Sequence, residues 1–232
     1  MFTLVRIHVP PTVTDSTGRH TTHPDPNHIW DYISKNHEKM RSENVRLLYM
    51  TRRHLQDDTS LIVEATDADS LSDFINTHLA HLKYVRGIRV INMSKMRFFK
   101  VPLEHPSGFF RFTITIDAVP DQVGKVYDTI AALKPGRDIV VNYIAQTFQS
   151  FDACIMVSVL ARSKNHMDVF VDDCVRTIPG VIDAEITHIS KTMRLVTAAE
   201  WEKFLGAHFI TAEGEQIKDI DPYRDDSLIA GC

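Results

Sequence analysis

The sequence predicts an α+β fold made of two tandem copies of a βαββαβ unit. An apolar helical stripe repeats at a constant offset (167 − 71 = 96), and an earlier pair of helices repeats at 123 − 30 = 93. The last strands of the two copies end in similar segments, "SKMRFF" and "SKTMRL". This order of elements describes a ferredoxin-like unit, in which two helices cover one face of a four-stranded antiparallel sheet. The later stripe is Met167, Phe170, Val171, Cys174, Val175 and Ile178, and the earlier one is Leu71, Phe74, Ile75, His78, Leu79 and Leu82.

The first copy covers residues 1–100. It starts with the strand "TLVRIHV", and a long polar connection over 10–27 then leads to a helix with Trp30 and Ile33 on its apolar face. The strands "NVRLLYMTRRH" and "DTSLIVEAT" form a hairpin. The start signal Asp69-Ser70 opens the second helix, Gly87 follows it, and a last strand completes the unit.

The second copy covers residues 110–196. "FRFTITID" alternates as a half-buried strand, and Val123 and Val126 mark the first helix. "DIVVNYIAQTF" and "FDACIMVSVLA" form the hairpin, and Ser163 opens a helix that stops at Pro179-Gly180 before the final strand. In the remaining segment, 197–232, the capping box of Thr197 and Glu200 predicts a further helix followed by a polar tail.

Each copy of about 95 residues leaves one apolar sheet face uncovered. Packing two such faces together, as in a dimeric α/β barrel, covers both. The repeat therefore predicts sheet-on-sheet packing, either between the two halves or between chains. The short linker 101–109 favours pairing within the chain. We also expect the protein to be a homo-oligomer.

Composition narrows the function classes. The chain has 232 residues, 44% of them hydrophobic, and a net charge of −4 without any long run of lysine or arginine. These values argue against direct nucleic-acid binding, which needs a concentrated basic patch. No apolar stretch is long enough for a membrane span, and "MFTLVRIHVPP" lacks the features of a signal peptide. We therefore expect a cytoplasmic protein without a membrane partner.

The stretch "FDACIMVSVLARSKNHMDVFVDDCVRTIPGVIDAEITH" resembles the C-terminal effector-binding domain of the Lrp/AsnC family of regulators. The resemblance covers about 110–196 well and the first copy only by pattern. The family's turn glycine is replaced by Gln149 or Ser150, and the family's helix-turn-helix is missing. The resemblance implies a stand-alone tandem sensor of a small-molecule effector, such as an amino acid. It would act in transcription regulation through a DNA-binding partner protein, with no catalytic residues and no cofactor.

Two groups of residues are candidate sites. Under the resemblance, Asp152, Ser150 and the first-copy equivalent Asp58 contact the ligand; the alternative is that they form local turn bonds. His20, His23 and His28 have a spacing that could bind a metal ion, although histidines in polar loops are usually solvated.

An enzyme remains the alternative function. The same α/β-barrel scaffold also carries small monooxygenases and haem proteins related to chlorite dismutase, and the fold alone does not choose among them. For a haem protein, His188 is the candidate axial ligand.

Overall fold

The computed structural model confirms an α+β fold with antiparallel strands. It describes residues 1–9, 12–14, 20–22, 27–54, 58–83, 85–99, 108–148, 153–197 and 199–201. The chain divides into two compact units. The first comprises Met1–Asn92 with Ile189–Thr197, and the second comprises Met93–His188 with Ala198–Cys232. The boundary therefore runs through two long strands, which each contribute one part to either unit.

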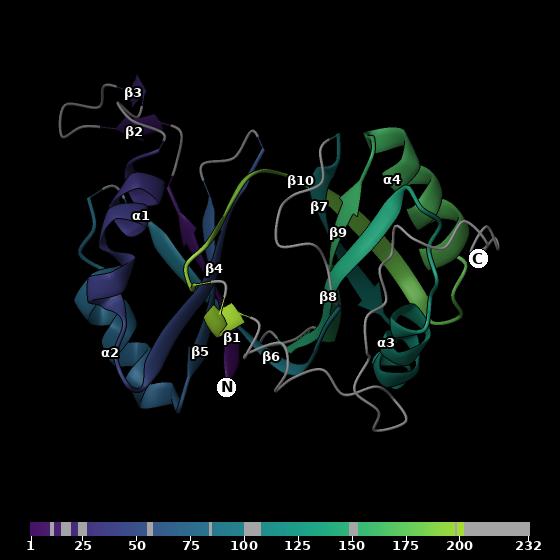
Figure 1. The fold of residues 1–232 in the computed structure, drawn as a ribbon, viewed down its shortest axis with the longest axis horizontal. Coiled ribbons are helices and arrows are strands. Elements are labelled where there is room, and N and C mark those ends of the chain that lie inside the picture. Colours follow the sequence, from purple (N-terminus) through teal and green to yellow (C-terminus); the bar gives the residue numbers. More distant parts are fainter. Residues whose placement is uncertain are drawn as a thin grey trace. The chain divides into compact units, whose positions relative to one another are not determined.

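The elements alternate in the predicted order along both halves (Figure 1). In the first half they are β1 (Phe2–His8), β2 (Thr12–Thr14), β3 (His20–Thr22), α1 (His28–Met40), β4 (Val45–Arg53), β5 (Thr59–Ala65), α2 (Ala68–His78) and β6 (Gly87–Phe98). In the second half they are β7 (Phe110–Ala118), α3 (Val123–Ala131), β8 (Ile139–Phe148), β9 (Ala153–Ala161), α4 (Lys164–Phe170), the π-helical turn η1 (Val171–Val175) and β10 (Val181–Arg194).

The first unit has the strand order β1-β5-β4 followed by the end of β10. The Arg86 N–H donates to the His8 carbonyl at 3.0 Å, so the chain begins β6 beside the end of β1. The long connection predicted over 10–27 contains a small hairpin of β2 and β3. Within the first unit, β1 thus lies between β5 and the start of β6.

The second unit repeats this order, with β7 paired to β9 and β9 paired to β8. The Val119 N–H donates to the Gly180 carbonyl at 2.8 Å, which places the start of β10 beside the end of β7. On the other edge, the Phe99 N–H after β6 donates to the Asn142 carbonyl at 2.8 Å.

Each unit has its own hydrophobic core between its helices and one face of its sheet (Figure 1). In the first unit Val5 and Ile7 of β1 pack in the core that includes Ile33 of α1 and Phe74 of α2. In the second unit Ile114 and Val157 share the core with Tyr127 of α3. Because strand side chains alternate, Arg6 and His8 lie on the opposite sheet face from Val5 and Ile7.

The predicted stripe of the last helix is confirmed as core, since all six residues are buried. Its backbone differs from the expected regular helix. After α4 the chain widens into η1, where the Arg176 N–H donates to the Val171 carbonyl five residues back, at 2.8 Å. The Ser163 hydroxyl accepts from the His166 N–H at 3.2 Å, which confirms Ser163 as the helix start.

The second helix of the first unit starts two residues earlier than the signal Asp69-Ser70 suggests. Asp67 is its N-cap, and the Asp67 carboxylate accepts from the Ser70 N–H at 2.7 Å. This bond to the ionised form is the main reason that the pKa of Asp67 lies below its ordinary value. The predicted C-terminal helix is described only over 199–201, and the polar tail lies outside the described residues.

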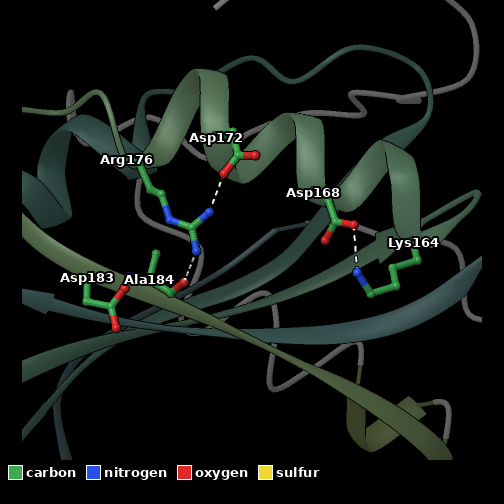
Figure 2. A network of polar contacts seen from close by, with 6 residues as sticks. All are labelled: Lys164, Asp168, Asp172, Arg176, Asp183 and Ala184. Atoms are coloured by element: carbon green, nitrogen blue, oxygen red, sulfur yellow. Dashed lines mark hydrogen bonds and ion pairs between the residues drawn. The ribbon is translucent and has the colours of Figure 1, made fainter.

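Arg176 ties the end of η1 to β10 (Figure 2). Its guanidinium pairs with Asp172 one turn earlier and donates to the Ala184 carbonyl at 2.7 Å. A second ion pair, Lys164 to Asp168 at 2.7 Å, lies further towards the start of the helix. The bond from Arg176 to Ala184 therefore links the chain before Pro179-Gly180 to the chain after it.

Tyr127 gives the second unit a measurable response to alkaline pH. The side chain is 1% exposed, and burial raises its pKa to about 12. Between pH 10 and 12 the unfolded chain releases the phenolic proton while the folded chain keeps it, so stability falls as pH rises. Two pH units correspond to a loss of roughly 3 kcal/mol. In urea unfolding experiments, the free energy of unfolding of the Tyr127→Phe variant should fall less than that of wild type between pH 10 and 12. Equal slopes for both proteins would contradict the assignment.

Candidate functional site

His8 and Asp58 form a hydrogen-bonded pair on the face of the first sheet that the helices do not cover. Ile7 of β1 pairs with Thr59 of β5. His8 follows Ile7 and Asp58 precedes Thr59, so these two residues lie opposite each other. The His8 Nδ1 lies 2.6 Å from the Asp58 Oδ1. The carboxylate side chain is 13% exposed and the imidazole 57% exposed, so the acid is the anchored partner.

This pair has the arrangement of a general base with an orienting acid. An ionised carboxylate can only accept, so Nδ1 of His8 must carry the proton. In neutral His8 the lone pair is then on Nε2, the ring nitrogen that faces away from Asp58. A nitrogen held in this tautomer can take a proton from a bound molecule. As a mere surface ion pair it would contribute little to stability.

A cationic side chain lies two residues from the base on the same strand. Arg6 shares the sheet face of His8 and pairs in register with Ser60 of β5, which is 6% exposed. Ser60 in turn pairs with Thr51 of β4. Residues two apart on a strand are separated by roughly 7 Å. A guanidinium at that distance can stabilise the negative charge that forms when His8 removes a proton.

The predicted ligand residues are only partly placed. Asp58 is described, and its carboxylate contacts His8. Ser150 and Asp152 lie outside the described residues, so their predicted role stays a prediction. His8 itself was missed as a site residue, because its partner is fifty positions away in the sequence.

The predicted histidine metal site is not assembled from described residues. The backbone of His20 lies in β3 and His28 is the first residue of α1, while His23 lies outside the described ranges. Within those ranges, no three His, Cys, Asp or Glu side chains gather as a metal ion would require.

His188, the predicted axial haem ligand, packs beside two aromatic rings of β7. Its ring packs against Phe112, with centroids 5.2 Å apart, and is 6.1 Å from the ring of Phe110. Phe112 belongs to the core between the sheet and helices of the second unit. An axial histidine needs a nitrogen facing an open pocket; these ring contacts do not define such a pocket, so the axial role of His188 stays a prediction. No step is therefore assigned to haem.

Two shallow hollows lie at the other end of the first sheet. The larger, about 440 Å³, contains Arg46 and Glu64, whose charges already pair with each other. The smaller, about 220 Å³, is lined by Asp73, Phe74 and His78 among others. Neither hollow includes His8 or Asp58. We favour the His8–Asp58 pair because its hydrogen bond leaves a basic ring nitrogen on His8, whereas the charges of Arg46 and Glu64 in the larger hollow are already paired with each other.

No family model matches the chain, and no curated protein matches it. Solved structures do. A protein from Lactobacillus acidophilus, provisionally assigned as a monooxygenase, is 12% identical, with a TM-score of 0.48 over 84% of this chain and 93% of that chain. An anthrone oxidase-like protein is 10% identical, with a TM-score of 0.45 over 84% and 94%. A mutant chlorite dismutase from Candidatus Nitrospira defluvii is 9% identical, with a TM-score of 0.47 over 82% and 92%.

These comparisons correct the functional prediction. The sequence predicted a metabolite-sensing, transcription-regulator-related protein and preferred a non-enzyme, whereas these three matched structures are named as a monooxygenase, an anthrone oxidase-like protein and a chlorite dismutase. The names of the matched structures contradict both parts of this prediction. Similarity at this level assigns no residue a role in this chain. Among the described helices, none is long and apolar enough to cross a membrane.

Proposed function

We propose that this protein is an enzyme that removes a proton from a small organic acid, with His8 as the general base and Asp58 as the residue that orients it. The observation that carries the proposal is the 2.6 Å bond between the His8 Nδ1 and the Asp58 Oδ1. It leaves Nε2 as the basic nitrogen. A hydroxyl, enol or activated C–H group presented to Nε2 would lose its proton there.

Arg6 supports the same chemistry. Deprotonation leaves an oxyanion or enolate, and Arg6 places a cationic guanidinium on the same strand face as His8. Electron-rich anions of this kind are the form in which phenols and enols react with dioxygen. We therefore propose that dioxygen oxidises such a molecule, on a fold of two ferredoxin-like units in the arrangement of a dimeric α/β barrel. In an anthrone, one oxygen atom would form the new carbonyl and the other would leave as water; from a hydroquinone, dioxygen would take up two electrons and two protons and leave as hydrogen peroxide.

The experiment measures dioxygen uptake by purified protein against a panel of anthrones, hydroquinones and β-diketones. We expect uptake above the uncatalysed rate with at least one class. An Asp58→Asn variant should show roughly a tenfold or greater loss of that rate, because the amide no longer fixes the imidazole tautomer. No turnover of any panel member, or full activity of Asp58→Asn, would argue against the proposal.

A further inference from the structure

A polar group is buried on the helix-free sheet face of the second unit. Asn142 of β8 is 6% exposed and Ser158 of β9 is 3% exposed. The Asn142 Nδ2 lies 3.3 Å from the Ser158 Oγ, and the Arg111 Nη1 of β7 donates to the same oxygen at 3.4 Å. The Asn142 Oδ1 is buried and has no hydrogen-bond partner among the described residues. A buried acceptor without a partner costs free energy, and a bound hydroxyl group would remove that cost.

The first unit shows that the fold does not need these polar side chains. Both hairpins contain a β-bulge at the same place, at Leu48 in β4 and at Asn142 in β8 (142 − 48 = 94). Directly after the bulge, Tyr49 pairs with Ile62 in the first unit and Tyr143 pairs with Ser158 in the second (158 − 62 = 96). Leu48 is 1% exposed and Ile62 is 3% exposed.

The backbone carbonyl of the bulge residue accepts a hydrogen bond in both units. The Leu48 carbonyl accepts from the Leu195 N–H at 3.0 Å, and the Asn142 carbonyl accepts from the Phe99 N–H at 2.8 Å. Only the side chains differ: an apolar pair in one unit and a hydrogen-bonding pair in the other. A purely structural role is therefore met by leucine and isoleucine, and the polar pair calls for another explanation.

We propose that Asn142, Ser158 and Arg111 bind a small hydroxylated aromatic acid on the sheet of the second unit. The unpartnered Asn142 oxygen accepts from a hydroxyl group of the ligand, and the Arg111 guanidinium pairs with its carboxylate.

The surroundings suit an aromatic ring. Tyr143, directly after the bulge, lies 5.8 Å from the ring of Phe98, which makes an edge contact with Trp201 at 5.7 Å. On the other side, Leu160 pairs with Arg111 and clusters with Val140 and Phe109. Apolar and aromatic walls around a few converging polar groups are typical of small-molecule sites. This site lies in the other unit from His8 and does not depend on the proposed reaction.

The test measures the binding of salicylate by titration calorimetry. Benzoate, which lacks the hydroxyl group, and phenol, which lacks the carboxylate, serve as matched probes. Wild type should bind salicylate at least about tenfold more tightly than either, since each loses one buried polar contact. The double variant Asn142→Leu, Ser158→Ile carries the first-unit residues at both positions. It should unfold at the same or a higher temperature than wild type and lose the preference for salicylate.

Two further variants keep the outcome decisive if the double variant does not fold. Ser158→Ala removes only the bridging hydroxyl and should weaken salicylate binding. Arg111→Met should reduce the affinity for salicylate to that for phenol. His8→Gln should bind salicylate like wild type, which separates this site from the proposed reaction. Equal binding of the three probes by wild type, or unchanged binding by the double variant, would overturn the proposal and leave the polar pair as a water site.

Discussion

Replacing His8 with glutamine should lower kcat/KM for the substrate found in the dioxygen-uptake panel by about 10²–10⁴, the usual contribution of a positioned general base. Glutamine has a similar polar reach but cannot take up a proton at neutral pH. The side chain is 57% exposed, so the change should leave the unfolding temperature nearly unchanged. Steady-state kinetics beside a thermal melt would separate the loss of chemistry from a loss of fold.

His81 provides the matched control for this variant. It is an exposed histidine of the same unit, in the turn that follows α2, and it is not part of the His8–Asp58 pair. His81→Gln should keep wild-type activity. Combining His8→Gln with Asp58→Asn should cost little more than His8→Gln alone, because Asp58 acts through the imidazole. Fully additive losses would mean that Asp58 has a role of its own, and a fully active His8→Gln would remove the general base from the mechanism.

The core of each unit could be predicted from the sequence because its signal is local. Spacing alone identifies Met167, Phe170 and Val171 as core, and all three are buried. The same spacing cannot distinguish a regular helix from the wider turn of η1, since one extra backbone residue shifts the later side chains only slightly. The repeat therefore predicts which residues are buried better than it predicts the backbone between them.

The candidate site depends on strand register, which the sequence does not state. In the sequence His8 is only one polar residue in an apolar strand, and Asp58 is predicted to contact a ligand. Their pairing follows once Ile7 is opposite Thr59. The Asn142 site could have been found earlier by comparing the copies: "RLLYM" and "VVNYI" align on their tyrosines, with leucine in one copy and asparagine in the other. That comparison needed the correct offset, which changes between helices and strands.

Replacing Gly180 with alanine should destabilise the second unit by about 3 kcal/mol. Gly180 has a φ of +96°, where a side chain costs roughly 1–2 kcal/mol. A Cβ there would also lie 2.5 Å from the Gln122 Oε1 and 3.0 Å from the Gln122 Cβ, an overlap that costs about 1–3 kcal/mol more. A thermal melt should show a decrease of about 6–12 °C. The turn cannot relax easily, because the Gly180 carbonyl accepts from Val119 and Arg176 holds Ala184 just beyond it.

Gly87 is the control for this substitution, since it follows the equivalent helix of the first unit (180 − 87 = 93). It lies at the start of β6, its φ is not positive, and no atom lies within 4 Å of a Cβ built there. Gly87→Ala should therefore be neutral or stabilise by up to about 1 kcal/mol. Adding Gln122→Ala to Gly180→Ala should recover part of the loss, because it removes the overlap with the amide oxygen but leaves the unfavourable φ. A Gly180→Ala protein as stable as Gly87→Ala would show that this turn is free to change its conformation, and that the contacts from Val119 and Arg176 do not hold it.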